Sequence, residues 1–225
     1  MLAVLPVAAG PNGEGGGLGS ALLMVLVITV VAIVVSFLVG SLSPATLLAN
    51  LFGKDLRGSG SGNPGATNAG RVLGVKWGVL VGVLDVLKGL VPVLVAQQAL
   101  GLLLACVCGV FVVLGHMFSP FLKGRGGKGV ATTLGVLLGV APWIALVALV
   151  TFGVAYAVTR RVGEASVITA LVLLLVGALQ GLDVVELARI DMVGVFVAVL
   201  AVLVLARHRR NIIVAIERRR RQVAG

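Results

Sequence analysis

The chain contains a series of apolar segments, and the longest of them could cross a lipid bilayer. A transmembrane helix needs roughly 20 apolar residues to span a hydrocarbon core of about 30 Å. Backbone groups in lipid must be hydrogen-bonded internally, so each segment is predicted to be an α-helix. The composition agrees, because hydrophobic residues make up 59% of the 225 residues and charged residues only 12%. The sequence therefore predicts a polytopic all-α membrane protein rather than a soluble domain.

We expect a bundle of seven transmembrane helices. The expected spans are residues 21–52, 72–97, 99–119, 129–142, 143–159, 165–181 and 191–208. Two alternatives remain open at Ala141-Pro142-Trp143: a tight turn between two short helices, or a kink in one long helix. The first span is long enough that its last part, from Gly40 onward, is expected to tilt or to extend beyond the bilayer.

Lysines and arginines set the expected orientation, because short cytoplasmic loops collect them. An exterior N-terminus followed by seven crossings brings one group of cations to the cytoplasmic side, together with the C-terminus. These are Lys54, Arg57, Arg71, Lys76, Lys123, Arg125, Lys128, Arg160, Arg161 and the cluster from Arg207 to Arg221. The exterior side then keeps Glu14, Asp183, Glu186, Arg189 and Asp191. Shifting the number of spans by one would leave part of these cations outside.

The two ends of the chain lie outside the expected bundle of residues 21–212. Residues 1–20 have no basic residue ahead of their apolar stretch, unlike a cleaved signal peptide, and are expected to form a flexible exterior leader. Residues 213–225 are expected to form a basic cytoplasmic tail. The formal net charge of +10 would also suit nucleic-acid binding. We favour contact of the tail with anionic lipid headgroups, because most of the charge follows from the topology.

A glycine-rich polar loop, residues 57–71, lies between the first two expected spans. Its glycines let backbone N–H groups approach an anion, while hydroxyl, amide and guanidinium groups add donors and charge. The candidate anion ligands are Arg57, Ser61, Asn63, Thr67, Asn68 and Arg71. An ordinary flexible linker is the alternative, but it does not explain an arginine at each end.

A second glycine-rich segment, residues 123–129, is basic and leads into an apolar helix. Free N–H groups and the positive end of a helix dipole would make a phosphate site there. The segment is not a nucleotide P-loop, because Leu122 occupies the position of the first glycine and Gly129 follows Lys128. A flexible loop made basic only by topology is the alternative.

Other polar residues lie at the ends of spans or inside them. His208 and Asn211 stand where the last span meets the cytoplasm, a position at which histidine commonly contacts headgroups. Asp85 and Lys88 lie three residues apart on one helical face, either as a functional pair or as a structural pair that orients the helix. The Ser166 hydroxyl can bond back to its own helix.

The cysteines and histidines do not suggest a metal. Cys106 and Cys108 lie on different helix faces and are expected to be small apolar fillers. The sequence offers no cluster of histidine, cysteine and carboxylate with metal-ligand spacing, so we expect neither a metal nor another cofactor.

Taken together, these motifs resemble one known family. The pieces are Gly40-Ser41, residues 60–68 with Arg71, Leu84-Asp85 with Lys88-Gly89, Gly115-His116 with residues 126–132, and Arg207-His208 with Asn211-Ile212. In this order they resemble the bacterial integral-membrane glycerol-3-phosphate acyltransferases that use acyl phosphate as donor (PlsY family). The resemblance implies seven helices in the bacterial inner membrane and a catalytic domain that opens to the cytoplasm. It also implies acyl transfer to the sn-1 hydroxyl of glycerol 3-phosphate, with lysophosphatidic acid and inorganic phosphate as products, as the first acylation of phospholipid synthesis.

The resemblance also implies roles for single residues. The expected catalytic residues are Ser61, His208 and Asn211. The expected substrate-binding residues are Arg57, Asn63, Thr67, Asn68, Arg71, Arg125, Gly126, Gly127, Lys128, Gly129 and Ser166. The expected partners are glycerol 3-phosphate, acyl phosphate and membrane lipid, with no nucleic acid and no metal. Gly124-Arg125 departs from the Phe-Lys usual in the family, and we expect phosphate binding to survive because the charge is kept.

Two questions stay open at the level of the sequence. The proton of the attacking hydroxyl could pass to His208 or to a phosphate oxygen of the donor, and we favour the second acceptor. Neither His116 nor His208 has an aspartate five residues later, so the box of the commoner acyltransferases is missing. A transporter or exchanger of an organic phosphate is the alternative function, although no motif recurs as an internal repeat. No feature of the sequence supports a third interpretation, a non-catalytic lipid-binding subunit.

Overall fold

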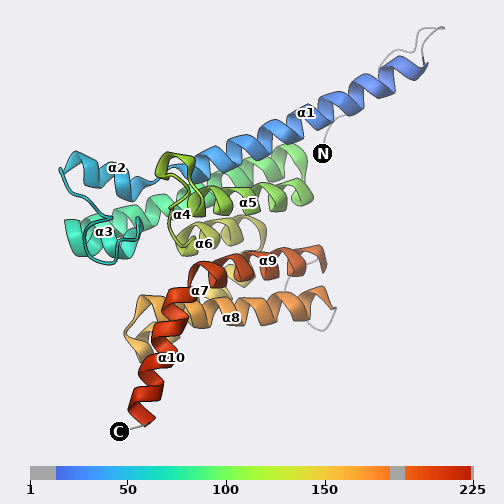
Figure 1. Ribbon diagram of the computed structural model, residues 1–225. Helices are drawn as coiled ribbons and strands as arrows, with labels where there is room; N and C mark the ends of the chain where they lie inside the picture. The colour runs from blue at the N-terminus through green and yellow to red at the C-terminus, as the bar shows by residue number, and fades with distance from the viewer. Residues whose placement is uncertain (1–13, 183–190, 224–225) are drawn as a thin grey trace.

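The computed structural model describes residues 14–182 and 191–223, and within these ranges every element of secondary structure is a helix (Figure 1). The α-helices are α1 (Glu14–Ser41), α2 (Pro44–Leu51), α3 (Ala66–Leu73), α4 (Val75–Leu100), α5 (Leu102–Met117), α6 (Val130–Val140), α7 (Pro142–Thr159), α8 (Val162–Gly181), α9 (Asp191–Arg207) and α10 (Arg209–Val223). A 3₁₀-helix, η1 (Pro120–Leu122), follows α5. The expected all-α fold is confirmed for this part of the chain.

Five of the described helices are long and apolar enough to cross a membrane: α1, α4, α5 extended through η1, α7 and α8. The pair α9 and α10, which bends by 64° at its break, is a sixth candidate. Helix α6 is apolar but has only 11 residues. At 1.5 Å per residue it is about 16 Å long, roughly half of a hydrocarbon core. A polytopic membrane protein is confirmed, whereas the count of seven spans stays a prediction.

The first expected span, residues 21–52, is two helices rather than one. Helix α1 begins earlier than expected, at Glu14, and ends at Ser41. A new helix starts at Pro44 because the Ser43 hydroxyl accepts a hydrogen bond from the Thr46 N–H (3.2 Å). Serine at the N-cap followed by proline is a strong helix start. The part after Gly40, which we expected to tilt or to extend beyond the bilayer, is therefore a separate helix that follows a break at residues 42–43.

The two alternatives at Ala141-Pro142-Trp143 are resolved in favour of a turn. Helix α6 ends at Val140 and α7 starts at Pro142, so the two helices are separated by a single residue. The expected leader, as far as residue 13, lies outside the described residues. So do Asp183, Glu186 and Arg189, which we expected on the exterior side.

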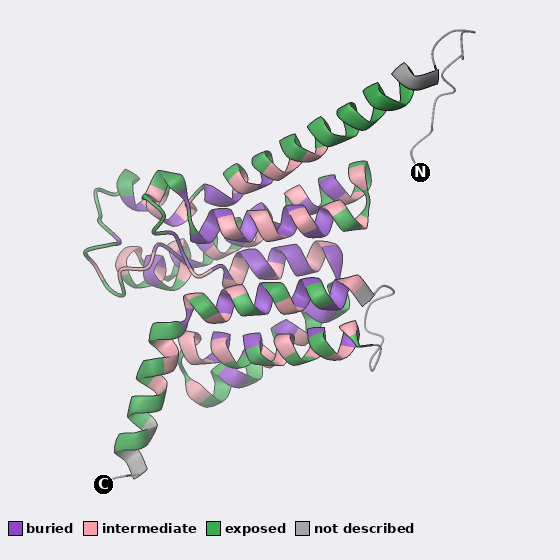
Figure 2. Ribbon diagram, turned by 45° about the vertical axis from the view of Figure 1, so that its right-hand side comes forward, coloured by how far each residue is buried: buried purple, intermediate pink, exposed green. Residues whose placement is uncertain are grey.

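The helices pack closely where glycine replaces a larger side chain. Helix α4 lies against α6, α8 against α9, and α1 against α5. A Cβ atom at Gly89 of α4 would overlap the Thr132 carbonyl of α6, and one at Gly135 of α6 would overlap the Val86 carbonyl of α4. Small residues let membrane helices approach in this way. Figure 2 shows the buried residues along these contacts, while the N-terminal half of α1 is exposed.

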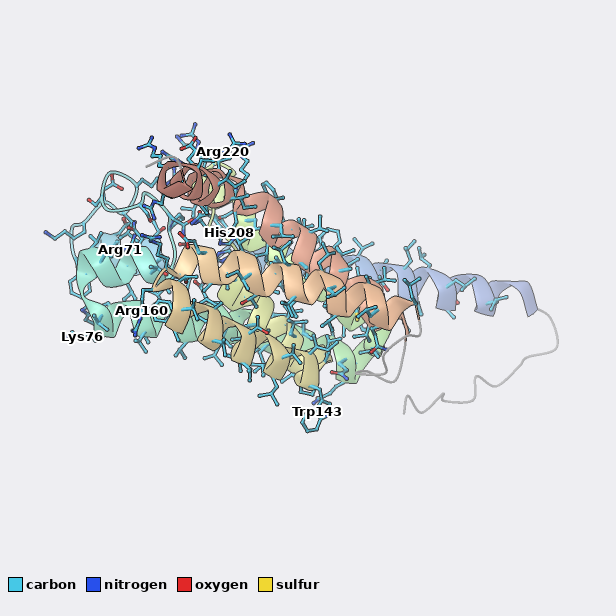
Figure 3. The ribbon with its side chains drawn as sticks, turned by 90° about the horizontal axis from the view of Figure 1, so that it is seen from below. Arg71, Lys76, Trp143, Arg160, His208 and Arg220 are labelled. Atoms are coloured by element: carbon cyan, nitrogen blue, oxygen red, sulfur yellow. The ribbon has the colours of Figure 1, made fainter. Side chains whose placement is uncertain are left out.

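The connections that carry the polar motifs gather at one end of the bundle (Figure 1). This end holds α2 and α3, the glycine-rich segment before α6, the turn between α7 and α8, and the junction of α9 with α10. Figure 3 places Arg71, Arg160 and His208 toward this end and Trp143 at the opposite end of α7. The packing therefore brings segments far apart in sequence to one face.

Candidate active site

The glycine-rich segment before α6 folds back onto the end of α5. The N–H of Gly126 donates to the Met117 carbonyl (3.1 Å), and the N–H of Gly127 donates to the His116 carbonyl (3.0 Å). A Cβ atom at Gly127 would overlap the imidazole of His116. Glycine is required at both positions because the segment lies so close to α5, and both N–H groups are already bonded to α5 carbonyls.

This finding corrects the expected phosphate cradle. We expected Gly126 and Gly127 to offer N–H groups to a phosphate, but both groups close the loop onto α5. Within the described ranges, the backbone N–H groups of Lys128, Gly129 and Val130 donate to no protein acceptor. The free donors thus begin at Lys128 and continue into the first turn of α6, where the helix dipole is positive.

Lys128 and Asn211 are separated by 83 residues and meet directly. The Lys128 Nζ donates to the Asn211 Oδ1 over 2.6 Å. Partial burial and the charges of Arg207 and Arg71 hold the pKa of the Lys128 amine below its ordinary value of 10.5. Among the described residues, none of these three cations has a carboxylate partner in an ion pair. Three uncompensated cations make a site suited to an anion.

Arg207, the last residue of α9, holds the glycine-rich segment. Its Nη2 donates to the Gly126 carbonyl (2.8 Å) and its Nε to the Gly127 carbonyl (3.2 Å). The guanidinium also lies over the Phe118 ring, 5.4 Å from the centroid. Sequence analysis gave Arg207 no role of its own, although its place directly before His208 in the motif Arg207-His208 was a signal.

His208 is buried at the break between α9 and α10. Its Nδ1 lies 2.8 Å from the Val204 carbonyl. A carbonyl oxygen can only accept, so we assign the proton to Nδ1, which leaves the Nε2 lone pair of the neutral ring available. This side-chain hydrogen bond lies at the last turn of α9, directly before the change of direction into α10.

The start of α8 completes this side of the site. A Cβ atom at Gly163 would overlap the Asn211 amide, so glycine allows α8 to touch the residue that binds Lys128. Ser166 follows one turn later on the same face. Its hydroxyl is buried and donates to the Val162 carbonyl (2.8 Å). The sequence predicts this back-bond, which leaves the oxygen only as an acceptor.

The loop between α2 and α3 is shaped by Asn68. The Asn68 Oδ1 accepts from the Ser61 N–H (2.7 Å), and its Nδ2 donates to the carbonyls of Leu56 (2.9 Å) and Ser59 (3.1 Å). Its side chain is buried. Asn68 therefore fixes the loop, because both ends of its amide are engaged, rather than offering a free donor as we expected.

The remaining expected ligands of this loop are open to a substrate. In the described part of the chain, the side chains of Ser61, Asn63 and Thr67 make no hydrogen bond to protein. Arg57 donates to the Leu122 carbonyl (2.8 Å) and so ties this loop to the segment before α6. Arg71, in the last turn of α3, and Arg125 are exposed.

Inside the bundle, Asp85 and Lys88 form the ion pair expected from their spacing. The Lys88 Nζ lies 2.9 Å from the Asp85 Oδ1 and also donates to the Leu42 carbonyl (2.7 Å). The His116 Nδ1 is 3.6 Å from the same carboxylate oxygen. The cluster joins α4, α5 and the break after α1, a geometry that favours the structural role.

The chain is similar over most of its length to known proteins. The family model described as Glycerol-3-phosphate acyltransferase matches residues 30–218. The glycerol-3-phosphate acyltransferase of Geobacter sulfurreducens is 43% identical over 180 residues, covering 79% of this chain and 89% of that protein. The enzyme of the same name from Aquifex aeolicus is 39% identical over 182 residues, covering 80% and 91%.

The fold is similar to solved structures as well. The crystal structure of PlsY (YgiH), an integral membrane glycerol 3-phosphate acyltransferase, in its glycerol 3-phosphate form has a TM-score of 0.76. It is 36% identical in sequence, and the match covers 85% of this chain and 93% of that one. The lysophosphatidic acid form of PlsY gives a TM-score of 0.74 at 35% identity. The chain belongs to the glycerol-3-phosphate acyltransferase family.

Proposed function

We propose that this acyltransferase moves a fatty acyl group from acyl phosphate to the sn-1 hydroxyl of glycerol 3-phosphate. The hydroxyl oxygen attacks the acyl carbonyl carbon, and the bond from that carbon to the phosphate oxygen breaks. The products are lysophosphatidic acid and inorganic phosphate. The observation that carries this proposal is the convergence of Lys128, Arg71 and Arg207 without a carboxylate partner, because both substrates bring a phosphate to the site.

The free donors of the site suit two separate tasks. The N–H groups at the start of α6, together with Lys128, are suited to a phosphate. The unpaired hydroxyls of Ser61 and Thr67 and the guanidinium of Arg71 are suited to the second phosphate or to the oxyanion that develops during attack. The hydrogen bond from Lys128 to Asn211 supports a role for Asn211 in holding that amine in place.

The proton of the hydroxyl has two possible acceptors, and we assign it to a phosphate oxygen of the donor. Transfer to this oxygen balances the reaction, since the proton leaves with inorganic phosphate. His208 would then orient substrate through its Nε2 lone pair. A His208→Gln enzyme should keep its turnover rate and lose substrate affinity, whereas a collapse of the rate at saturating substrate would make His208 the base.

We further propose that the acyl chain lies along the seam between α5 and α9. A shallow, open groove of about 190 Å³ lies there and has an entirely apolar lining. Its walls are Leu103, Cys106, Val107 and Val110 of α5, and Met192, Val195, Phe196 and Val199 of α9. Both helices run from this groove to the end of the bundle that holds His208, so an acyl chain in the seam would have its head at the site.

The proposed topology has seven spans, an exterior N-terminus, and a site that opens to the cytoplasm from the bacterial cell membrane. The short helix α6 and the turn at Ala141 support it, because α6 and α7 would enter and leave the membrane as a pair. The cations at the end that carries Arg71, Arg160 and His208 support the orientation (Figure 3).

Product analysis tests the proposed reaction. The purified protein in detergent micelles would receive palmitoyl phosphate and glycerol 3-phosphate, and mass spectrometry would identify the lipid product. We expect lysophosphatidic acid acylated at sn-1, in a one-to-one ratio with inorganic phosphate. Uptake of glycerol 3-phosphate into protein-containing vesicles without any acylated product would instead indicate a transporter.

A further inference from the structure

Among the described helices, α10 has the composition that differs most from the apolar bundle. It contains Arg209, Arg210 and residues 218–221 as six arginines, against one acidic residue, Glu217. Between the two arginine groups lies the apolar run of residues 212–216. The family match ends at residue 218, so the last arginines lie beyond it.

The apolar run of α10 is poorly covered by the rest of the protein. Ile213 is 55% exposed, Val214 39% and Ile216 48%, and arginines at 218, 220 and 221 are also exposed. The helix contacts α8 and α9, and Arg218 lies 3.8 Å from Glu164 of α8. Most of its surface is left without a protein partner (Figure 2).

The direction of α10 fits a position along a membrane surface. It turns away from α9 by 64° and runs away from the bundle at the end that carries the site (Figure 1). A turn of this size at the end of a spanning helix brings α10 closer to the plane of the interface than to the membrane normal. Basic helices with exposed apolar residues bind there, with arginine at the headgroups and aliphatic side chains in the acyl boundary.

We propose that α10 docks on the anionic headgroups of the surrounding bilayer. Five net positive charges on 15 residues match a negatively charged surface, and a zwitterionic surface would leave them unneutralised. The exposed Ile213 and Ile216 give the same contact an apolar component.

Docking of α10 would act on the site through Asn211, and this second step rests on the proposed function. Asn211 is in the first turn of α10, and its Oδ1 accepts from Lys128 (2.6 Å). A membrane that fixes α10 therefore fixes the acceptor of that hydrogen bond. The apparent affinity for glycerol 3-phosphate should rise with the anionic lipid content of the bilayer.

Limited trypsin digestion in nanodiscs tests the docking without any need for activity. One set of discs contains phosphatidylcholine alone, and the other contains phosphatidylglycerol in addition. We expect cleavage after residues 218–221 to be slowed in the phosphatidylglycerol discs and the protection to disappear at high salt, which screens exposed charges. Cleavage after the exposed Lys123, in the same discs, corrects for any effect of the lipid on trypsin itself.

Two variants with equal loss of charge make the test specific. In Arg218→Gln/Arg220→Gln/Arg221→Gln, cleavage at the remaining Arg219 should lose its protection, since each arginine near an anionic surface strengthens docking about fivefold. The control Lys54→Gln/Lys76→Gln/Arg160→Gln removes three exposed cations of other segments and should keep the protection. Equal cleavage in both lipids, or equal loss of protection in both variants, would overturn the proposal.

Kinetics in the same discs test the link to the site. For the unmodified protein, the KM for glycerol 3-phosphate should be about threefold lower with phosphatidylglycerol than for the α10 triple variant, and the two should agree in phosphatidylcholine. Protection from trypsin without this difference in KM would refute the link and leave the docking in place. Absence of turnover in every disc would contradict the proposed function and leave the trypsin result unaffected.

Discussion

Replacing Arg207 with lysine keeps the charge at the end of α9 and removes the fork that holds the glycine-rich segment. The arginine donates to two successive carbonyls, those of Gly126 and Gly127, at 2.8 and 3.2 Å. A lysine amine can reach one of them but cannot bridge both in a plane. The variant therefore loses one hydrogen bond from a charged donor.

The size of the effect follows from that single bond. A hydrogen bond from a charged donor contributes about 1.5–3 kcal/mol, and the partial exposure of Arg207 places it at the lower end of this range. A loss of about 1.4 kcal/mol corresponds to a tenfold change. Because the bond positions the segment that leads to Lys128, we expect the KM for glycerol 3-phosphate to rise about tenfold while kcat changes much less.

Steady-state release of inorganic phosphate, with glycerol 3-phosphate varied at saturating palmitoyl phosphate, measures both constants. Arg209→Lys is the matched control, because Arg209 is exposed and donates no hydrogen bond to any described residue. An unchanged KM in Arg207→Lys, or the same rise in Arg209→Lys, would refute the idea that Arg207 positions the segment.

Three further predictions concern the Lys128 amine, the close contact of Gly163 with the Asn211 amide, and the ion pair of Asp85 with Lys88. The lowered pKa of Lys128 means that its positive charge is lost as pH rises through a value below 10.5. The affinity for glycerol 3-phosphate, measured by calorimetry, should fall in that alkaline range. In Lys128→Arg the affinity should fall only at a higher pH. Gly163→Ala should lower kcat/KM about tenfold by displacing the amide that accepts from Lys128, whereas Gly153→Ala, in open space, should keep full activity. Asp85→Asn should destabilise the protein by about 3–5 kcal/mol in thermal unfolding, because the buried Lys88 loses its partner, and the added Lys88→Met should recover part of that loss; additive losses would count against the pair.

Local patterns in the sequence predicted the helices and several contacts within them. The length of the apolar segments predicted the membrane helices. The proline at position 142 was compatible with the turn at Ala141 that separates α6 from α7. The spacing of Asp85 and Lys88 predicted their ion pair, and the preference of a helical hydroxyl for a nearby carbonyl predicted the bond of Ser166. The membrane helices follow from runs of about 20 apolar residues, and the ion pair and the serine bond from residues within four positions of one another.

The contacts missed from the sequence are those made between residues more than four positions apart in the chain. A motif shows which residues carry hydrogen-bond donors, but not which of those donors form hydrogen bonds within the protein itself. The N–H groups of Gly126 and Gly127 and the amide of Asn68 are engaged in this way. The fork of Arg207 depends on α9 meeting a segment 80 residues earlier, which no local pattern encodes. The break after α1 likewise depends on a distant residue, because Lys88 donates a hydrogen bond to the Leu42 carbonyl.

Phosphate release by Lys128→Met measures most directly whether the cluster around Lys128 serves the proposed acyl transfer. The comparison needs palmitoyl phosphate with and without glycerol 3-phosphate, and Lys76→Met as a control that removes an exposed cation. The unmodified protein and the control should release phosphate only with both substrates, and Lys128→Met should release it at least about a hundredfold more slowly. Release by Lys128→Met at the unmodified rate would contradict the assigned site. No release by folded, unmodified protein that binds glycerol 3-phosphate would contradict the reaction.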